Sequence, residues 1–130
     1  MDINEITINS NPMAKPRMTR SDRWKKRPCV VKYFIYSGHI KWLIKSKNYV
    51  PSNELVMIFN ISMPNSWTKK KKAKMFGQPH QQTPDIDNLE KGILDSLFIN
   101  DMKVWKVCAS KRWSDCGSII IKNWSNYSVK

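Results

Sequence analysis

Cysteine and histidine are scarce in this sequence. Its 130 residues include three cysteines, which form no C-x-x-C pair, and two histidines. We therefore expect no structural zinc site, because such a site needs a cluster of these ligands at close spacing. No run of about 18 apolar residues exists, and the acidic amino end does not resemble a secretory signal. We expect a reduced, cytoplasmic protein without a membrane span.

Acidic residues are also few. Ten Asp and Glu stand against 23 Lys and Arg, which gives a formal net charge of +13. Such a surplus is typical of a protein with a polyanionic partner, above all nucleic acid. AT-rich coding is the alternative explanation, because eleven Asn and only three Ala accompany the lysines. Biased coding does not explain why residues 85–101 hold five of the ten acids and a single Lys.

The chain length fits one domain with one core, so we treat residues 1–130 as a single domain. Apolar periodicity predicts strands at 5–9, 55–62, 102–113 and 118–124, and helices at 30–46, 66–75 and 87–98. The order β-α-β-(α)-α-β-β predicts an α+β fold, in which two to three helices pack on a small mixed sheet of about four strands.

Three local features of this fold are also predicted. A turn at residues 114–117 is expected to join the last two strands as a hairpin. Ser66 is the expected cap of the short helix. Trp42, Trp105 and the cysteines are expected in the core, because they lie in or beside apolar periodic segments.

The segment P-D-I-D-N-L-E-K at residues 84–91 carries the most informative pattern. Its proline favours extended backbone, in which residues two apart point to the same side, so Asp85 and Asp87 can converge. Asp101 precedes the next predicted strand and could return to the same place. Carboxylate oxygens suit Mg²⁺ or Mn²⁺. An acidic centre on a basic protein is the pattern expected of a metal-dependent nuclease.

A structural role for the same acids is the alternative. Asp87 and Glu90 have the spacing of a capping box, which would only begin a helix. Lys91 stands four residues from both Asp87 and Asp95, and such surface pairs stabilise a helix by about 0.2–0.5 kcal/mol each. This alternative leaves the other two carboxylates of the cluster without a role.

The ordered set of residues resembles the RusA family of Holliday junction resolvases. The family motif D-x-D-N-x-x-K falls on Asp85, Asp87, Asn88 and Lys91, and continues as L-D-S-L at residues 94–97. A later N-D-x-x-V at residues 100–104 stands where the family usually has a pair of aspartates. The segment at 64–71, His80 and the Lys-Pro-Arg at 15–17 resemble the phage-type branch of the family.

The resemblance implies a Mg²⁺-dependent endonuclease, with Mn²⁺ as a possible substitute, that cuts four-way DNA junctions as a homodimer. It implies that Asp85, Asp87 and Asp101 hold the metal and that Lys91 faces the phosphate. The residues that would support them are Asn88, Asp95, Asn100 and His80. For Asp95 the alternative is an ordinary exposed acid, and for His80 an incidental loop residue.

Basic residues in two segments are the candidates for contacting DNA phosphates, which gives affinity rather than sequence recognition. They are Lys15, Arg17, Arg20, Arg23, Lys25 and Lys26 in the first segment, and Lys69, Lys70, Lys71 and Lys72 in the second. The alternative for the second segment is a solvated helix face. Trp24 and Trp67, flanked by basic residues, are candidates for stacking on unpaired bases.

Three other functions remain open from the sequence. One is a nuclease with a broader preference for flaps and other branched DNA. Another is a non-catalytic basic DNA-binding module with a structural acidic segment. Cleavage that depends on a divalent cation, and its loss in Asp87→Asn, separates an enzyme from this module. The last is a protein made basic by coding alone, which predicts negligible DNA affinity at about 150 mM salt.

Overall fold

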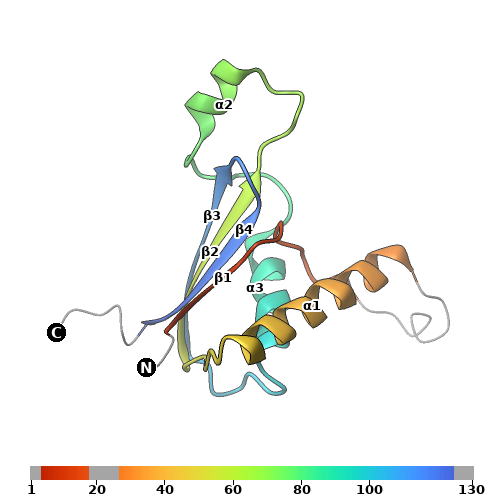
Figure 1. The fold of residues 1–130 in the computed structure, drawn as a ribbon, viewed down its shortest axis with the longest axis vertical. Coiled ribbons are helices and arrows are strands. Elements are labelled where there is room, and N and C mark those ends of the chain that lie inside the picture. The colour runs from red at the N-terminus through yellow and green to blue at the C-terminus, as the bar shows by residue number, and fades with distance from the viewer. Residues whose placement is uncertain (1–3, 18–26, 125–130) are drawn as a thin grey trace.

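The computed structural model describes residues 4–17 and 27–124, which form one α+β unit (Figure 1). The elements in chain order are β1 (Glu5–Ile8), α1 (Pro28–Ser46), β2 (Glu54–Ser62), α2 (Lys69–Met75), α3 (Ile86–Leu97), β3 (Lys106–Ser114) and β4 (Ser118–Asn123). The fold class and the order of elements predicted from the sequence are confirmed.

The four strands form one mixed sheet in the order β1-β4-β2-β3. β2 pairs with β3 in parallel, and β4 runs antiparallel to both β2 and β1. The nearly continuous apolar sequence of β2 suits this interior position, and Leu55, Met57 and Phe59 are fully buried. The predicted hairpin is therefore wrong, because β2 lies between β3 and β4.

The connection between β3 and β4 passes over the end of β2. Because β2 lies between them, β3 and β4 are two strand spacings apart, about 10 Å. Residues 115–117 can span this distance, since an extended chain covers about 3.3–3.6 Å per residue. The amide of Met63 donates to the carbonyl of Ser114 (3.0 Å) at this end. A Cβ on Gly117 would lie 1.9 Å from Oδ1 of Asn11, so only glycine fits there.

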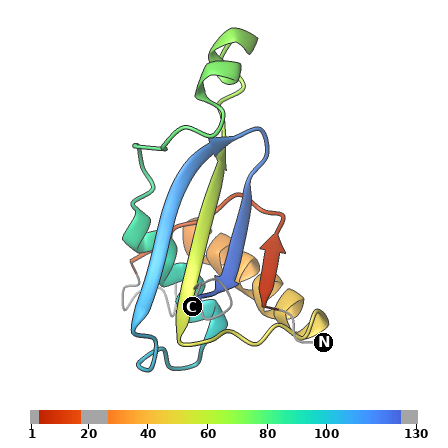
Figure 2. The same ribbon diagram turned by 90° about the vertical axis from the view of Figure 1, so that its left-hand side faces the viewer.

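Helices α1 and α3 cover one face of the sheet, and Figure 2 shows both of them behind the strands. α3 contributes Leu89 and Ile93 to the core, both with no exposed surface. α1 contributes a stripe that includes Tyr33, Tyr36 and Ile40.

Several aromatic and sulfur side chains lie outside the core, against expectation. Trp42 is 63% and Trp105 70% exposed, and all three cysteines are exposed. In α1 the residues at 33, 36, 37 and 40 face inward, which turns Trp42 to the opposite side of the helix. The tyrosines take the inner positions because their rings fill the core and the Tyr33 hydroxyl finds a partner, the Gly92 carbonyl at 3.1 Å.

Helix α2 projects from the end of the sheet, away from α1 and α3 (Figure 1). It has no buried residue, and its amino end is capped by Thr68, whose hydroxyl accepts from the Lys71 amide at 3.2 Å. The expectation of a Ser66 cap is wrong because the helix begins three residues later. Trp67 anchors its base on the buried Trp113, with ring centroids 4.8 Å apart.

Candidate active site

Helix α3 carries most of the acidic segment, and its burial pattern decides which of those side chains face solvent. Leu89 and Ile93 pack into the core, which leaves Asp87 and Lys91 on the exposed side. Asp85 occupies the capping position in extended backbone, but its side chain caps no amide. The capping box considered as the alternative is not formed: Asp87 lies inside the first turn, where its Oδ1 accepts from the amide of Asn88 at 2.9 Å.

The loop that leads into α3 is held by a lysine of the sheet. Nζ of Lys111, on β3, donates to the carbonyls of Gln82 (2.7 Å) and Pro84 (2.8 Å). These two bonds fix the backbone directly before Asp85. Lys111 therefore positions the first candidate metal ligand, a role that nothing in its strand sequence signals.

An alternating chain of charges runs along the outer side of α3. The Lys15 amine contacts Asp95, Asp95 contacts Lys91 (3.1 Å), and Lys91 contacts Asp101 (3.6 Å). Hydrogen bonding to Asp95, together with the charges of Asp95 and Asp101, raises the pKa of Lys91. Burial alone would raise the pKa of Asp95, but hydrogen bonds and charges from Lys15 and Lys91 hold it below its usual range.

The amino-terminal segment reaches this chain of charges because α3 has a glycine at the point of contact. The Lys15 amide donates to the Asn88 carbonyl (3.2 Å). A Cβ on Gly92 would lie 3.3 Å from the Met13 carbonyl and 3.4 Å from the Tyr33 ring. The absence of a side chain at Gly92 thus allows residues 13–15 to lie along the helix, and Lys15 reaches Asp95, which is 80 positions later in the sequence.

The loop after α3 brings Asp101 back toward the middle of the helix. Its carbonyl accepts from the Val104 amide (3.0 Å), while Oδ1 of Asn100 accepts from the Met102 amide (3.0 Å). Asn100, where the family usually has an aspartate, thus serves the turn. Asp101 contacts α3 at Lys91, one helical turn after Asp87.

The donor chemistry of Asp85, Asp87 and Asp101 fits a divalent cation, because carboxylate oxygens are the preferred ligands of Mg²⁺. Within residues 4–17 and 27–124, no three His, Cys, Asp or Glu side chains are close enough to hold one ion together. Asp85 and Asp87 share the first turn of α3 and are exposed, whereas Asp101 is paired with Lys91. The metal-ligand assignment therefore stays a prediction supported by chemistry.

The basic candidates have different surroundings. Lys15 is bound to Asp95 rather than free for DNA. Arg17 is exposed, and its carbonyl accepts from Arg27 (2.8 Å). Other candidates lie outside the described residues: Arg20, Arg23, Lys25 and Lys26, together with Trp24. On projecting helix α2 the candidates are Lys69, Lys70, Lys71 and Lys72. The first three are exposed and Lys72 is half-buried. Nζ of Lys71 lies over the ring of Trp67, 4.3 Å from its centroid.

His80 belongs to the base of the α2 projection rather than to the acidic segment. It is 4% exposed, its ring centroid lies 4.3 Å from that of Trp113, and its amide donates to the Lys111 carbonyl (3.0 Å). Burial, with the nearby charge of Lys111, lowers its pKa. His80 lies in the loop between α2 and α3, where it packs into the fold and, within the described residues, makes no hydrogen bond or ion pair with the acidic segment; its part in the site stays a prediction.

Comparison with known proteins assigns the family. A model of the endodeoxyribonuclease RusA matches residues 9–122. The chain belongs to the RusA family. This family consists of endodeoxyribonucleases that act on branched DNA junctions, and the match includes every candidate ligand and both basic segments. No curated protein matches the chain significantly. No helix in the described part of this RusA-family chain is long and apolar enough to cross a membrane.

Proposed function

We propose that this RusA-family protein resolves four-way DNA junctions by paired symmetric cuts, as a cytoplasmic homodimer that depends on Mg²⁺ or Mn²⁺ and serves DNA recombination and repair. One observation carries the proposal: Asp85 and Asp87 are exposed at the amino end of α3, one helical turn before a protonated Lys91, in a protein of net charge +13. A basic protein concentrates DNA, and carboxylates beside a lysine are the groups that metal-assisted phosphodiester hydrolysis needs.

Asp85, Asp87 and Asp101 are the residues that would hold the metal. When bound, the metal lowers the pKa of a coordinated water and neutralises charge on the phosphate. The protein's own contribution begins with Lys111, whose two hydrogen bonds orient the backbone before Asp85.

Lys91 would act on the phosphate directly. Its side chain is 55% exposed, and Asp95 and Asp101 raise its pKa, which keeps its full positive charge at neutral pH. An ammonium group at this position can donate to a phosphate oxygen and stabilise the negative charge that builds up during cleavage. Asp95 supports this role because it holds the amine 3.1 Å away, on the exposed side of α3.

The remaining basic residues would bind the arms of the junction. Arg17, Lys69, Lys70 and Lys71 are exposed and Lys72 is half-buried, so their charges can contact phosphates without sequence preference. A dimer with two-fold symmetry matches the pseudo-symmetry of a four-way junction and would bring one acidic site to each of two opposed strands.

The decisive experiment is cleavage of an end-labelled synthetic four-way junction with Mg²⁺ or with EDTA. Wild type is expected to give paired nicks with Mg²⁺ alone. Asp87→Asn should lose at least about 100-fold in rate, because it removes a predicted ligand of the metal that activates the water. Asp115→Asn is the matched control: it removes one exposed acid from the far end of the sheet and should cut like wild type.

A non-catalytic DNA-binding module is the second candidate, and the pairing of Asp101 with Lys91 instead of with the other carboxylates favours it. Its signature is that wild type and Asp87→Asn shift the junction equally and neither cuts with Mg²⁺ or Mn²⁺. Flap and splayed-arm substrates in the same assay test a third possibility. Equal cleavage of all branched forms would replace junction resolution with a broader nuclease activity.

A further inference from the structure

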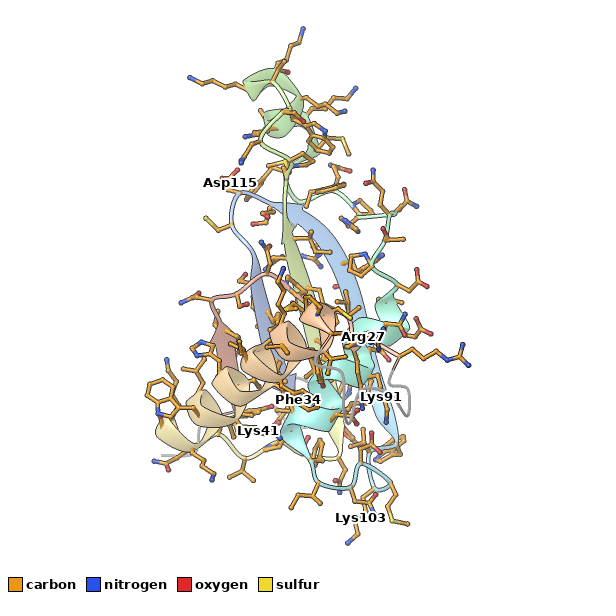
Figure 3. All side chains as sticks on the ribbon, turned by 90° about the vertical axis from the view of Figure 1, so that its right-hand side faces the viewer. Arg27, Phe34, Lys41, Lys91, Lys103 and Asp115 are labelled. Carbon is orange, nitrogen blue, oxygen red and sulfur yellow. The ribbon has the colours of Figure 1, made fainter. Side chains whose placement is uncertain are left out.

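A cleft of about 680 Å³ lies between the second half of α1 and helix α3, next to Lys91. Figure 3 shows Lys41 on α1 and Lys91 on α3, two helices that lie side by side. Four lysines and one aspartate give the cleft its charge: Lys15, Lys41, Lys45, Lys91 and Asp95. Neither Lys41 nor Lys45 was a candidate from the sequence, although their spacing of four residues within a predicted helix places them on one side.

The charges in this cleft are only partly balanced. Lys15 and Lys91 are both in ion pairs with Asp95, and Lys91 also contacts Asp101. Lys41 and Lys45 are exposed and form no ion pair with any residue of the described chain. Two uncompensated positive charges therefore line one wall of the cleft, and they attract an anionic ligand.

The cleft also has an apolar lining. Ile44 on α1 and Leu97 and Phe98 at the end of α3 are half-buried there, and Ile99 is fully exposed. A free phosphate ion would gain nothing from these apolar side chains, whereas a nucleotide can place its sugar or base against them and its phosphates at the amines. The two lysines are one helical turn apart, about 5–6 Å between their Cβ atoms, a separation comparable to that of successive phosphates along one strand.

We infer that the cleft between α1 and α3 binds the sugar-phosphate backbone of the DNA strand that flanks the cut, with Lys41 and Lys45 as its phosphate contacts. This inference rests on the proposed function, because it extends the path of the DNA from Lys91 along α1. Helix α1, which packs on the sheet through its tyrosines, would thus also bind DNA through its carboxyl-terminal half.

The test is the salt dependence of DNA binding by the double variant Lys41→Gln/Lys45→Gln. Binding to a fluorescent four-way junction is measured in EDTA, so that cleavage plays no part. Each lost phosphate contact lowers the slope of log K against log[salt] by about 0.7–0.9, so we expect a fall of about 1.4–1.8 for the pair. The affinity ratio of wild type to variant should then shrink about tenfold between about 50 and about 200 mM salt.

Lys32→Gln/Lys47→Gln is the matched control. It removes the same charge from α1 and its end but from residues that do not line the cleft, so its slope should stay close to wild type. Basic residues near the carboxyl end of a helix also stabilise the helix, so removing them could lower stability as well as DNA affinity. Thermal unfolding of both double variants measures this effect on stability separately from DNA binding. A loss of stability in Lys41→Gln/Lys45→Gln with an unchanged slope overturns the inference.

The outcomes also separate this inference from the proposed function. If wild type and both double variants bind DNA with the expected salt dependence but wild type never cuts, the proposed nuclease activity is refuted and the DNA-binding role of the cleft stands. If wild type cuts junctions but the two double variants have equal slopes, the nuclease activity stands and the DNA-binding role of the cleft is refuted. Absence of DNA binding by wild type would refute both.

Discussion

Replacing Asp95 with Asn should destabilise the protein by about 1.3–2 kcal/mol at pH 7. Asp95 and Lys15 are only 24% and 29% exposed, so their pair resembles a hydrogen bond to a charged group in a half-buried setting, about 1–1.5 kcal/mol. The pair with Lys91 is more exposed and adds the value of a helical i,i+4 pair, about 0.3–0.5 kcal/mol. With an unfolding entropy of about 2.1 cal/mol/K per residue, this corresponds to a fall in Tm of about 5–7 °C.

Glu90→Gln is the control for this measurement. It lies on the same helix and removes the same charge, so long-range repulsion within the basic protein changes equally in both variants. Burial, together with the charge of Asp87, raises the pKa of Glu90. A carboxyl with a raised pKa is destabilised when charged in the folded protein, so its neutralisation should leave the free energy of unfolding unchanged or raise it.

The pH dependence of unfolding is an independent test of whether charged Asp95 stabilises the folded protein. The folded pKa of Asp95 is below its ordinary value of 3.8, so its stabilising contribution is fully present above that pH and is lost as the pH falls through the lower, folded value. Urea unfolding of wild type and Asp95→Asn should differ by a constant amount from pH 7 to pH 5, and the difference should shrink at pH 3.5. Equal midpoints of wild type and Asp95→Asn at pH 7, or an equal loss in Glu90→Gln, would refute the reasoning.

Three further predictions concern packing. Gly92→Val should lower the free energy of unfolding by about 1–3 kcal/mol, because a Cβ there crowds the Met13 carbonyl, and an unchanged urea midpoint would contradict this contact. His80 has a lowered pKa, so wild type should lose stability as the pH falls below 6.5; His80→Phe should flatten that dependence in urea titrations at pH 7.5 and 5.5, and parallel curves would count against it. Trp67→Ala removes the contact with Trp113, so trypsin should cut at the α2 lysines faster while Tm changes little; an unchanged cleavage rate would show that α2 is held otherwise.

Periodicity predicted the elements well because most of them bury one regular face. The apolar face of α3, through Leu89 and Ile93, and the continuous apolar run of β2 were both visible in the sequence and are both in the core. Strand pairing was harder, since a turn of three residues suits a hairpin as well as a step over one strand. The apolar run of β2 suits an interior strand, but no local signal encodes that its two neighbours are β3 and β4.

The candidate site was predictable in its residue types but not in its contacts. The motif identified the carboxylates and Lys91 from spacing, and Lys91 lies four residues from acids on both sides in sequence. In the structure it contacts Asp95 and Asp101, because the loop after α3 turns back along the helix. Lys15 and Lys111 reach the site from segments far from the motif, so only tertiary structure places them.

These contacts explain how so many like charges are tolerated on one short helix and the loop after it. Carboxylates that approach one another repel and raise one another's pKa unless a cation lies between them. Lys91 and Lys15 supply that cation for Asp95 and Asp101, so the second half of the acidic segment is neutralised within the protein. Asp85 and Asp87 have no ion-pair partner in the described chain, which leaves the amino end of α3 as the place where an external cation gains most. On the proposed path, a phosphate drawn to that cation would meet Lys91 next along the helix and the uncompensated Lys41 and Lys45 beyond it, so the gradient of charge along α3 and α1 would set one direction for the strand.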